Sequence, residues 1–374
     1  MRVAQSELPR YIEGEGTCEA SRPLLIAEHP THNSIDEEWM TQMTSSTAGP
    51  SAIVSPENTT VGIVGLGDMG AAIATSIVRT FPLMVSDLRK EAVDKLVALG
   101  ARRADSLPAL ADQCEVVILV VVDDKQVNQI VAELLRHPGK LHTIIVSSTV
   151  LPSTVIALSE QAAKAGLALI DAPVSGGAER ACVGTITVLI GGEEAQVRRC
   201  WRVFESFGRG LFHLGPVGAG SAGKLVNNLL SLGANMLVIE AMQLAEAYGI
   251  SEDAVTEFIP LGTGDSRNIR TWGRIDRARR SHTLAGTPAI YDIFSKDVKS
   301  AAKAAGERGV VLPIAATIGA MMAEKMKVRD QYLEARGLTG PLPRCAICDQ
   351  ELAAPYRKAG VHPECTLDPR GSAR

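Results

Sequence analysis

The sequence lacks three features that would place it in a functional class directly. Its 38 Lys and Arg residues nearly balance its 42 Asp and Glu residues, and a net charge of −4 argues against a general nucleic-acid binder. No apolar run approaches the roughly 20 residues that a membrane-spanning helix needs. The N-terminus has no basic segment followed by an apolar core, so we expect no secretory signal. The sequence therefore predicts a cytoplasmic protein that binds neither membranes nor nucleic acid.

Cysteine is also scarce, with seven residues, three of which lie close together near the C-terminus. An odd count with such clustering is more typical of metal ligation than of a disulfide framework. The chain has 374 residues, of which 46% are hydrophobic, enough for two domains and additional segments. Residues 1–57 differ from the rest because nine acidic residues face only three arginines without sustained periodicity. We expect this segment to be a disordered acidic leader.

The most informative stretch is the glycine motif Gly65-Leu66-Gly67-Asp68-Met69-Gly70. A β-branched run at 60–64 precedes it and a helical pattern at 71–78 follows it. A second strand then ends on Asp87, 22 residues after the first glycine. Alone, the motif is also compatible with a simple glycine-rich turn. Because strand, helix, second strand and acid are in register, we predict a dinucleotide-binding site.

Each part of this site has a physical role. The first glycine permits a tight turn, the second lets the backbone approach a pyrophosphate, and the third lets helix and strand pack closely. The helix N-terminus then presents N–H groups to the phosphates. Asp87 would accept hydrogen bonds from the ribose hydroxyls and repel a 2′-phosphate, which favours NAD over NADP, although nearby Arg89 softens that preference. The predicted cofactor-binding residues here are Gly65, Gly67, Asp68, Met69, Gly70 and Asp87.

Strand and helix patterns continue to alternate after this unit. Buried strands are expected at 114–122, 141–146, 167–170 and 185–190, with helices at 90–99 and 124–135. This alternation predicts an α/β fold with a Rossmann-like, doubly wound parallel sheet over residues 58–218. Ligands collect at the carboxyl ends of such strands. Five residues fall there and are candidates for binding, with helix caps and turn glycines as the alternative: Ser148, Thr149, Ser175, Gly176 and Gly177.

A second glycine-rich turn, at 215–223, opens a long and nearly all-apolar helix that runs to Gly249. Apolar residues all round predict a helix buried between domains. Lys224 and Asn228 lie four residues apart and share one face. Burial and the positive helix end would both lower the pKa of Lys224, as a lysine general acid/base requires. The alternative is a lysine that extends to solvent, and the polar Asn228 beside it favours the functional interpretation.

Six ordered blocks carry a family resemblance: Gly65–Gly70, Ser148-Thr149, Asp171–Gly177, Gly184-Thr185, Gly218–Asn228 and Ser295-Lys296-Asp297. From about Val61 to about Arg336 the chain resembles the β-hydroxyacid dehydrogenases, the group of 3-hydroxyisobutyrate dehydrogenase, tartronate semialdehyde reductase and L-threonate dehydrogenase. The resemblance implies a Rossmann domain, a long interdomain helix and an all-α C-terminal domain at 219–336, as in 6-phosphogluconate dehydrogenase. It also implies a homodimer or homotetramer.

The resemblance further implies an activity, namely NAD(P)-dependent oxidation or reduction of a small β-hydroxy acid. Lys224 would be the acid/base and Asn228 its support, while Ser148, Ser175, Gly176 and Gly177 would hold the substrate carboxylate. The positions that would touch the nicotinamide nucleotide are Val121, Val122, Gln126, Thr149 and Lys296. Many members carry Asp where Val146 stands and Leu-Pro where Val121-Val122 stands. Segments 121–126 and 291–297 look most like the L-threonate branch, which favours a four-carbon sugar acid.

Two other functions compete with the dehydrogenase. One is a non-catalytic scaffold on the same fold, and the other is an imine reductase-like enzyme that uses NADPH. Both alternatives usually go with loss or replacement of the acid/base lysine. Lys224 is present, which favours the dehydrogenase.

Residues 337–374 depart from the family, whose members normally end near this point. They contain Cys345, Cys348, His362 and Cys365, four soft ligands in two close pairs. Tetrahedral zinc is held in this way, each pair binding one edge of the ion. A disordered tail with scattered thiols is the alternative, but so short a segment could not fold on a core alone. We therefore predict a structural zinc site with no part in catalysis.

Overall fold

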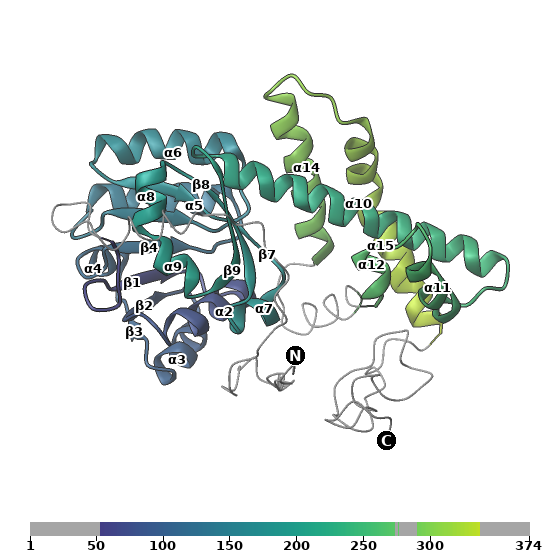
Figure 1. Ribbon diagram of the computed structural model, residues 1–374, viewed down its shortest axis with the longest axis horizontal. Helices are drawn as coiled ribbons and strands as arrows, with labels where there is room; N and C mark the ends of the chain where they lie inside the picture. The colour runs from purple at the N-terminus through teal and green to yellow at the C-terminus, as the bar shows by residue number, and fades with distance from the viewer. Residues whose placement is uncertain (1–52, 274–275, 277–289, 337–374) are drawn as a thin grey trace, which may run out of the picture. The chain divides into compact units, whose positions relative to one another are not determined.

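The computed structural model describes residues 53–273, 276 and 290–336 (Figure 1). Most of the predicted leader and the whole predicted zinc tail therefore lie outside the described residues. The chain divides into two compact units, Met1–Lys224 and Leu225–Arg374. The division falls six residues beyond the boundary predicted at 218/219, inside one long helix.

The first unit is built on the parallel sheet that the sequence predicts. Its strands β3, β2, β1, β4, β5 and β6 follow one another in this order, and all of these neighbours pair in parallel. The strands are β1 (Val61–Val64), β2 (Leu83–Ser86), β3 (Arg102–Arg103), β4 (Val116–Leu119), β5 (Thr143–Val146) and β6 (Ala168–Asp171). The order reverses between β1 and β4, and ligands bind at such a point in open α/β sheets.

One end of the sheet differs from the prediction. We expected β8 (Ile186–Gly191) to be another parallel strand, but it pairs antiparallel with β6 and with β7 (Val174–Ser175). The chain passes from β6 into β7 and then through the five-residue helix α7 (Ala178–Cys182). Parallel strands need a crossover of a dozen or more residues, and α7 is too short for one, so β8 runs back antiparallel to β7. The strand β9 (Gly208–Gly215) then pairs in parallel with β8.

Helices cover the sheet on both faces (Figure 1). They are α2 (Asp68–Ile77), α3 (Lys90–Ala98), α4 (Leu107–Ala111), α5 (Asp124–Arg136), α6 (Pro152–Lys164), α8 (Glu194–Arg199) and α9 (Trp201–Glu205). Successive residues of β4 belong to different cores, because Ile118 packs in the cluster with Phe204 whereas Val117 and Leu119 pack in the cluster with Val131. This alternation is the two-residue period of a strand buried on both faces, which explains its continuous apolar sequence.

The second unit is helical. It contains most of α10 (Ala219–Ala247), followed by α11 (Glu252–Phe258), η1 (Ile259–Leu261), α12 (Arg267–Arg270), α14 (Ile290–Gly306) and α15 (Pro313–Ala335). Ser251 caps α11, and its hydroxyl accepts the Ala254 N–H at 3.2 Å. The core packs Met236 and Ile239 of α10 against Val298 of α14 and Met322 of α15.

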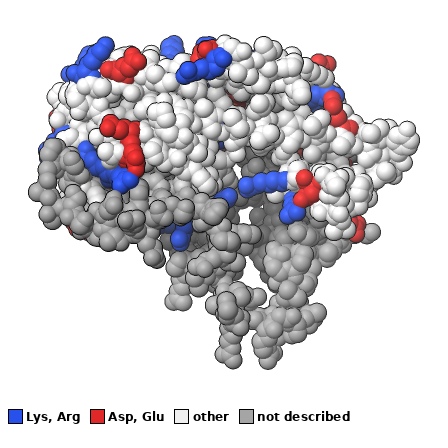
Figure 2. All heavy atoms as spheres, turned by 45° about the horizontal axis from the view of Figure 1, so that its top comes forward, with Lys and Arg blue, Asp and Glu red and all other residues white. Residues whose placement is uncertain are grey.

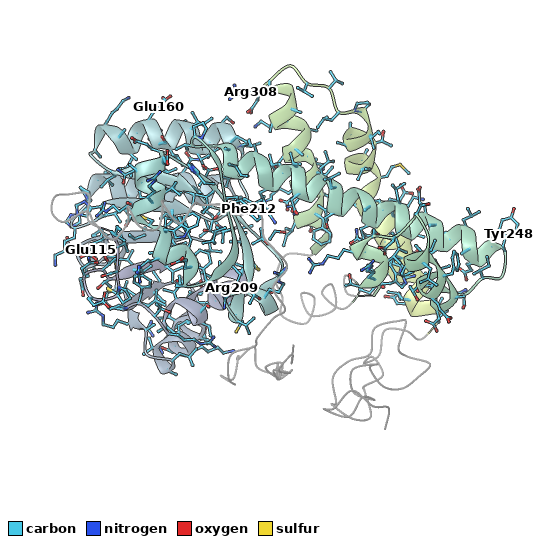
Figure 3. The ribbon with its side chains drawn as sticks, in the orientation of Figure 1. Glu115, Glu160, Arg209, Phe212, Tyr248 and Arg308 are labelled. Atoms are coloured by element: carbon cyan, nitrogen blue, oxygen red, sulfur yellow. The ribbon has the colours of Figure 1, made fainter. Side chains whose placement is uncertain are left out.

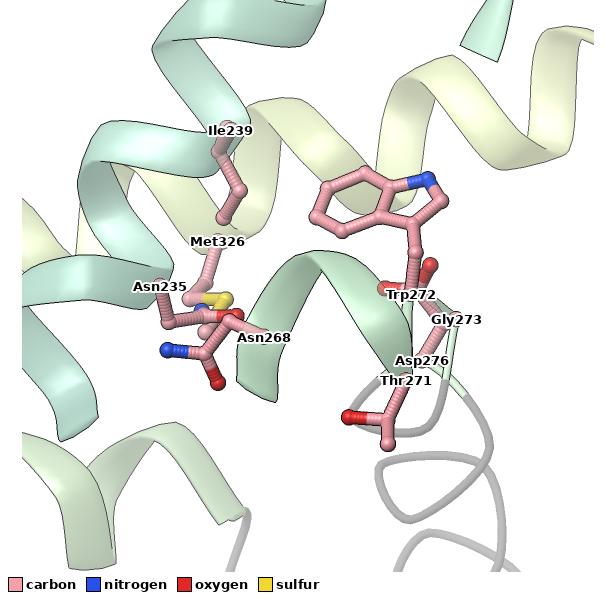
Figure 4. A pocket seen from close by; sticks show the side chains of 8 residues that line it. All are labelled: Asn235, Ile239, Asn268, Thr271, Trp272, Gly273, Asp276 and Met326. Atoms are coloured by element: carbon pink, nitrogen blue, oxygen red, sulfur yellow. The ribbon is translucent and has the colours of Figure 1, made fainter. Parts of the chain in front are cut away.

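A buried arginine ties this unit together. Arg329 of α15 is 6% exposed and its guanidinium donates to Glu252 and Asp276, at 3.0 Å in the latter case. The same group lies over the rings of Trp272 and Tyr332, 4.8 and 4.9 Å from their centres. A buried charge is tolerated because two carboxylates and two aromatic faces surround it. Beside it lies a hollow about the size of a water molecule, lined in part by Asn235, Trp272 and Asp276 (Figure 4).

The long helix α10 is not buried all round, contrary to the prediction from its apolar sequence. One stripe is open in the single chain: Val226, Leu230, Leu237 and Leu244 are 60 to 69% exposed. Tyr248, just beyond the helix, is 80% exposed (Figure 3). Among the described residues α10 is also long and apolar enough to cross a membrane, so the expectation that no apolar run approaches that length was wrong. Half of its most apolar window is buried within the protein, as in ordinary core helices, so this is weak evidence for a membrane span.

Charged side chains of both signs lie next to one another on the face shown in Figure 2. Several charged side chains form ion pairs in the structure, among them Lys90 with Asp94 on α3, at 2.6 Å. Exposed pairs of this kind contribute little to stability. The described part of that face shows no continuous basic patch.

Candidate active site

The glycine turn between β1 and α2 needs two of its glycines for steric reasons. Gly65 has φ +95°, and a Cβ there would lie 2.3 Å from the carbonyl oxygen of Val120. A Cβ on Gly70 would lie 1.9 Å from the carbonyl oxygen of Gly65. Neither approach is possible for a residue with a side chain. The first and third glycines therefore hold the turn and pack the helix against it, as predicted.

The middle glycine is different. Gly67 has an ordinary φ of −62°, and a Cβ there would meet nothing within 4 Å. It is the N-cap of α2, where no side chain caps the helix. Bare backbone at an uncapped helix N-terminus, next to open space, suits a phosphate group that accepts from the N–H groups. The turn therefore fits the pyrophosphate of a dinucleotide.

Asp87, immediately after β2, is bonded to this turn. Its carboxylate accepts the Leu66 N–H at 2.6 Å and the Arg89 N–H at 2.8 Å. Partial burial alone would raise the pKa of Asp87, but the hydrogen bonds from the Arg89 side chain and from the two backbone N–H groups outweigh it and lower that pKa. The carboxylate is therefore ionised at neutral pH. The Arg89 side chain also bonds to this carboxylate, at 3.1 Å, in a solvent-exposed ion pair of the kind that contributes little to stability.

Predicted site residues also meet at the carboxyl ends of β4 and β5. The N–H of Val121 donates to the Ser148 hydroxyl at 2.8 Å, and the N–H of Val122 donates to the Gln126 side chain at 3.0 Å. Ser148 is 3% exposed, so in this structure its hydroxyl fixes the backbone that follows β4. Its contact with a substrate carboxylate stays a prediction. Thr149, which follows Ser148, is half-buried.

The glycine pair predicted to hold the carboxylate follows β7. Gly176 and Gly177 have φ +139° and +88°, so both occupy backbone conformations that favour glycine. Ser175 pairs with Thr187 of β8. Because β6 and β7 run in the same direction, this turn lies at the same edge of the sheet as the glycine motif. The structure thus gathers the predicted residues of the first unit at one edge, and whether they bind substrate stays a prediction.

Lys224 lies in the second turn of α10 and is half-buried. It is the last residue of the first unit. Asn228, one turn later on the same helix face, belongs to the second unit, as does Lys296 of α14. The lowered pKa that we expected for Lys224 stays a prediction.

Asn228 is fixed by a residue to which sequence reasoning gave no role. Its amide nitrogen donates to Asp297 at 2.7 Å, and its oxygen accepts from Asn227 at 3.1 Å. Asp297 is 6% exposed, and its other oxygen lies 3.6 Å from the Lys296 ammonium. Asp297 therefore connects two predicted site residues, Asn228 and Lys296. The available signal was its position directly after Lys296, within the block Ser295-Lys296-Asp297.

The described residues contain no group of three or more His, Cys, Asp or Glu side chains able to hold a metal ion. The predicted zinc ligands Cys345, Cys348, His362 and Cys365 lie outside the described residues.

Substituting Gly67 separates cofactor binding from folding. We expect Gly67→Ala to fold with unchanged thermal stability, because its Cβ enters open space at an ordinary φ. The same Cβ would occupy the space for the pyrophosphate and weaken NAD binding at least about tenfold, or about 1.4 kcal/mol. Isothermal titration of NAD measures this, with Gly306→Ala, another open glycine, as control. Equal NAD affinity in Gly67→Ala and wild type would contradict the assignment of the turn.

Comparisons with known proteins agree with this geometry. Residues 60–215 match the family described as the NAD binding domain of 6-phosphogluconate dehydrogenase. Residues 218–340 match the family described as NAD-binding of NADP-dependent 3-hydroxyisobutyrate dehydrogenase. The two matches follow one another along the chain, and together they extend from the first unit into the second.

Individual relatives give the same result. The chain is 33% identical to an NAD-dependent L-serine dehydrogenase of Pseudomonas aeruginosa, over 66% of this chain and 85% of the relative. It is 33% identical to an L-threonate dehydrogenase of Cupriavidus necator, over 68% and 86%. The crystal structure of a 3-hydroxyisobutyrate dehydrogenase from Salmonella typhimurium matches with a TM-score of 0.60 and 30% identity, over 71% of this chain and 94% of that one. The chain therefore belongs to the β-hydroxyacid dehydrogenase family, the NAD(P)-dependent oxidoreductases that include 3-hydroxyisobutyrate dehydrogenase.

Proposed function

We propose that the protein oxidises a small, polar β-hydroxy acid with NAD, using Lys224 as general base. The observation that carries this proposal is the pairing of Lys224 with Asn228 on one face of α10, where Asn228 is buried and its amide is held by Asp297. A buried amide of fixed orientation next to a helical lysine supports a catalytic role for the pair more than a lysine that merely extends to solvent.

The chemistry follows from the residues. NAD, when bound, accepts the hydride from the carbinol carbon. The neutral amine of Lys224 takes the proton from the substrate hydroxyl, so the carbinol becomes a carbonyl and the lysine becomes an ammonium. Asn228 orients the lysine or the substrate. Ser175 and the N–H groups of the turn at 176–177 hold the substrate carboxylate. In the opposite direction, the Lys224 ammonium donates its proton to the carbonyl oxygen.

Asp87 supports NAD as the preferred cofactor. Its lowered pKa keeps the carboxylate negative, and a negative charge beside the adenosine ribose opposes a 2′-phosphate. Arg89 forms an ion pair with the same carboxylate and partly neutralises its charge. The protein would therefore also accept NADP to some extent.

The named relatives support a polar substrate. One acts on L-serine and another on L-threonate by their names, and both are 33% identical to this chain. We assign a four-carbon sugar acid of the threonate type as the substrate. The other candidate substrates are 3-hydroxyisobutyrate and tartronate semialdehyde. A NADPH-dependent imine reduction is the competing activity.

A screen of small hydroxy acids for NADH production tests the function. We expect turnover with one or more polar hydroxy acids and a loss of about 10²- to 10⁴-fold in kcat in Lys224→Ala, because proton transfer is lost. NAD affinity should stay unchanged in that variant. Lys164→Ala, at the exposed end of α6, is the matched control and should retain full activity. Turnover that survives Lys224→Ala would reject the acid/base role.

We also propose that the chain forms a homodimer or homotetramer through the exposed stripe of α10. The stripe contains Val226, Leu230, Leu237 and Leu244, and exposed apolar side chains gathered along one helix face mark an interface. A second copy of the chain presents the same stripe, so a two-fold axis would cover both.

Sedimentation velocity tests this assembly. We expect Leu237→Glu to dissociate the oligomer, because two carboxylates would be buried at the interface. Leu99→Glu, an equally apolar exposed position after α3, should leave the assembly intact. A monomeric wild-type protein, or an unchanged oligomer in Leu237→Glu, would contradict the proposal.

The zinc site remains a proposal from ligand spacing alone. We expect one zinc ion per full-length chain by plasma emission spectrometry and loss of that metal in Cys345→Ser, because a tetrahedral site cannot close on three ligands. Dehydrogenase activity should be the same in both proteins. If the purified full-length protein contains no zinc, the site is disproved.

A further inference from the structure

Asp171, the last residue of β6, holds the start of the helix that carries Lys224. It is 0% exposed. One carboxylate oxygen accepts the Gly218 N–H at 2.7 Å, and the other accepts the Ser221 N–H at 2.6 Å. All of these residues belong to the first unit. The two contacts span 47 and 50 residues of sequence, so they fix α10 to the sheet and not to its own loop.

These two N–H groups are the ones that helices usually satisfy locally. In a capping box, the residue before the helix and the third helical residue each accept the other's N–H through their side chains. Here Gly218 stands directly before Ala219, the first residue of α10, and has no side chain. Its φ of +96° sets the turn into the helix. Asp171, at the end of β6, therefore accepts both N–H groups in place of the two local side chains.

The helix also lies unusually close to the sheet. A Cβ on Gly220 would lie 2.4 Å from the Leu189 carbonyl oxygen, and a Cβ on Gly191 would lie 2.5 Å from the Asp171 carboxylate. Backbone thus packs on backbone, with the carboxylate between them. Gly191 and Gly220 leave space for this contact because they have no side chain, and the two hydrogen bonds orient the start of α10 on the sheet.

Burying the Asp171 carboxylate is unfavourable, because it removes a charged group from water. Burial raises the pKa of Asp171, and the N–H groups of Gly218 and Ser221 offset this only in part. An apolar side chain would avoid the desolvation, so the residue is explained better by the position it imposes than by stability.

We propose that Asp171 is a positioning residue that sets the rotation and height of the first turns of α10, and through them the place of the Lys224 amine. Lys224 lies three residues after Ser221, less than one turn along the helix. This inference rests on the proposed role of Lys224, since a displacement of about 1 Å of a catalytic group can cost about 10²-fold in rate.

Asp171→Asn tests the proposal in the full-length protein. The amide has the shape of the carboxylate, but its NH₂ group cannot accept, so one of the two N–H bonds is lost. We expect amide hydrogen exchange across 218–224 to rise at least tenfold, and kcat to fall about ten- to a hundredfold. NAD affinity should stay within twofold, because the glycine turn follows β1 and Asp171 ends β6. That combination separates positioning from a general loss of structure.

Glu115→Gln is the matched control. Glu115 also accepts a backbone N–H from another segment, that of Thr60 at 2.8 Å, but at the amino end of β1 and β4 (Figure 3). It should change neither exchange at 218–224 nor kcat. Should Asp171→Asn fail to fold, Gly191→Ala perturbs the same contact from the sheet side, because its Cβ would lie 2.5 Å from the Asp171 carboxylate and 2.7 and 2.9 Å from the backbone nitrogens of Gly220 and Ala219.

The outcomes are distinguishable. Exchange and kcat in Asp171→Asn equal to those of Glu115→Gln would overturn the positioning role and leave the dehydrogenase proposal standing. Absence of turnover in the wild-type protein would instead contradict the proposed function. Amide hydrogen exchange at 218–224 would then still decide whether Asp171 anchors the helix. Faster exchange with an unchanged kcat would also refute the proposal, since Lys224 would then not depend on the anchor.

Discussion

Carboxylates that accept backbone N–H groups from another segment fix the loops at the carboxyl edge of the sheet. Asp87 bonds the glycine turn through Leu66, and Asp171 bonds the start of α10. Asp124 of α5 accepts the Leu151 N–H at 3.0 Å and the Thr154 hydroxyl at the start of α6. Each bond joins segments that are more than 20 residues apart in sequence. Loops are otherwise the most mobile parts of a domain, so these bonds give the edge the rigidity that a binding site requires.

The helical unit also relies on carboxylates with little exposure, but these accept hydrogen bonds from side chains. Asp297 holds the Asn228 amide in one of its two orientations, and it also lies beside Lys296. Arg329 binds Glu252 and Asp276 and connects α15 to α11. Such groups are costly to bury, and each is compensated by partners of opposite charge or matching polarity. The unit thus has a core of Met, Ile and Val side chains that is organised around a few polar bonds.

Much of the fold could be predicted from sequence because its signals are local. Short apolar runs predicted β1, β2, β4, β5 and β6, and the glycine motif located the turn into α2. The direction of β8 could not be read, since it depends on how the chain returns after β7 and not on the residues of β8. The roles of Asp171 and Asp297 were missed because their partners lie 47 to 69 residues away. The open face of α10 was missed because an apolar pattern does not say what covers it.

The two aspartates that hold the first unit respond to protons in opposite ways. Asp87 has a lowered pKa in the folded chain, so its stabilisation is present above the ordinary value of about 3.9 and is lost as the pH falls below that value. Asp171 has a raised pKa, so its destabilisation is relieved as the pH falls toward about 3.9 from above. On acidification the free energy of unfolding therefore first rises as Asp171 is protonated, and then falls as Asp87 is protonated. The two carboxyls therefore contribute opposite pH dependences to the stability of the first unit.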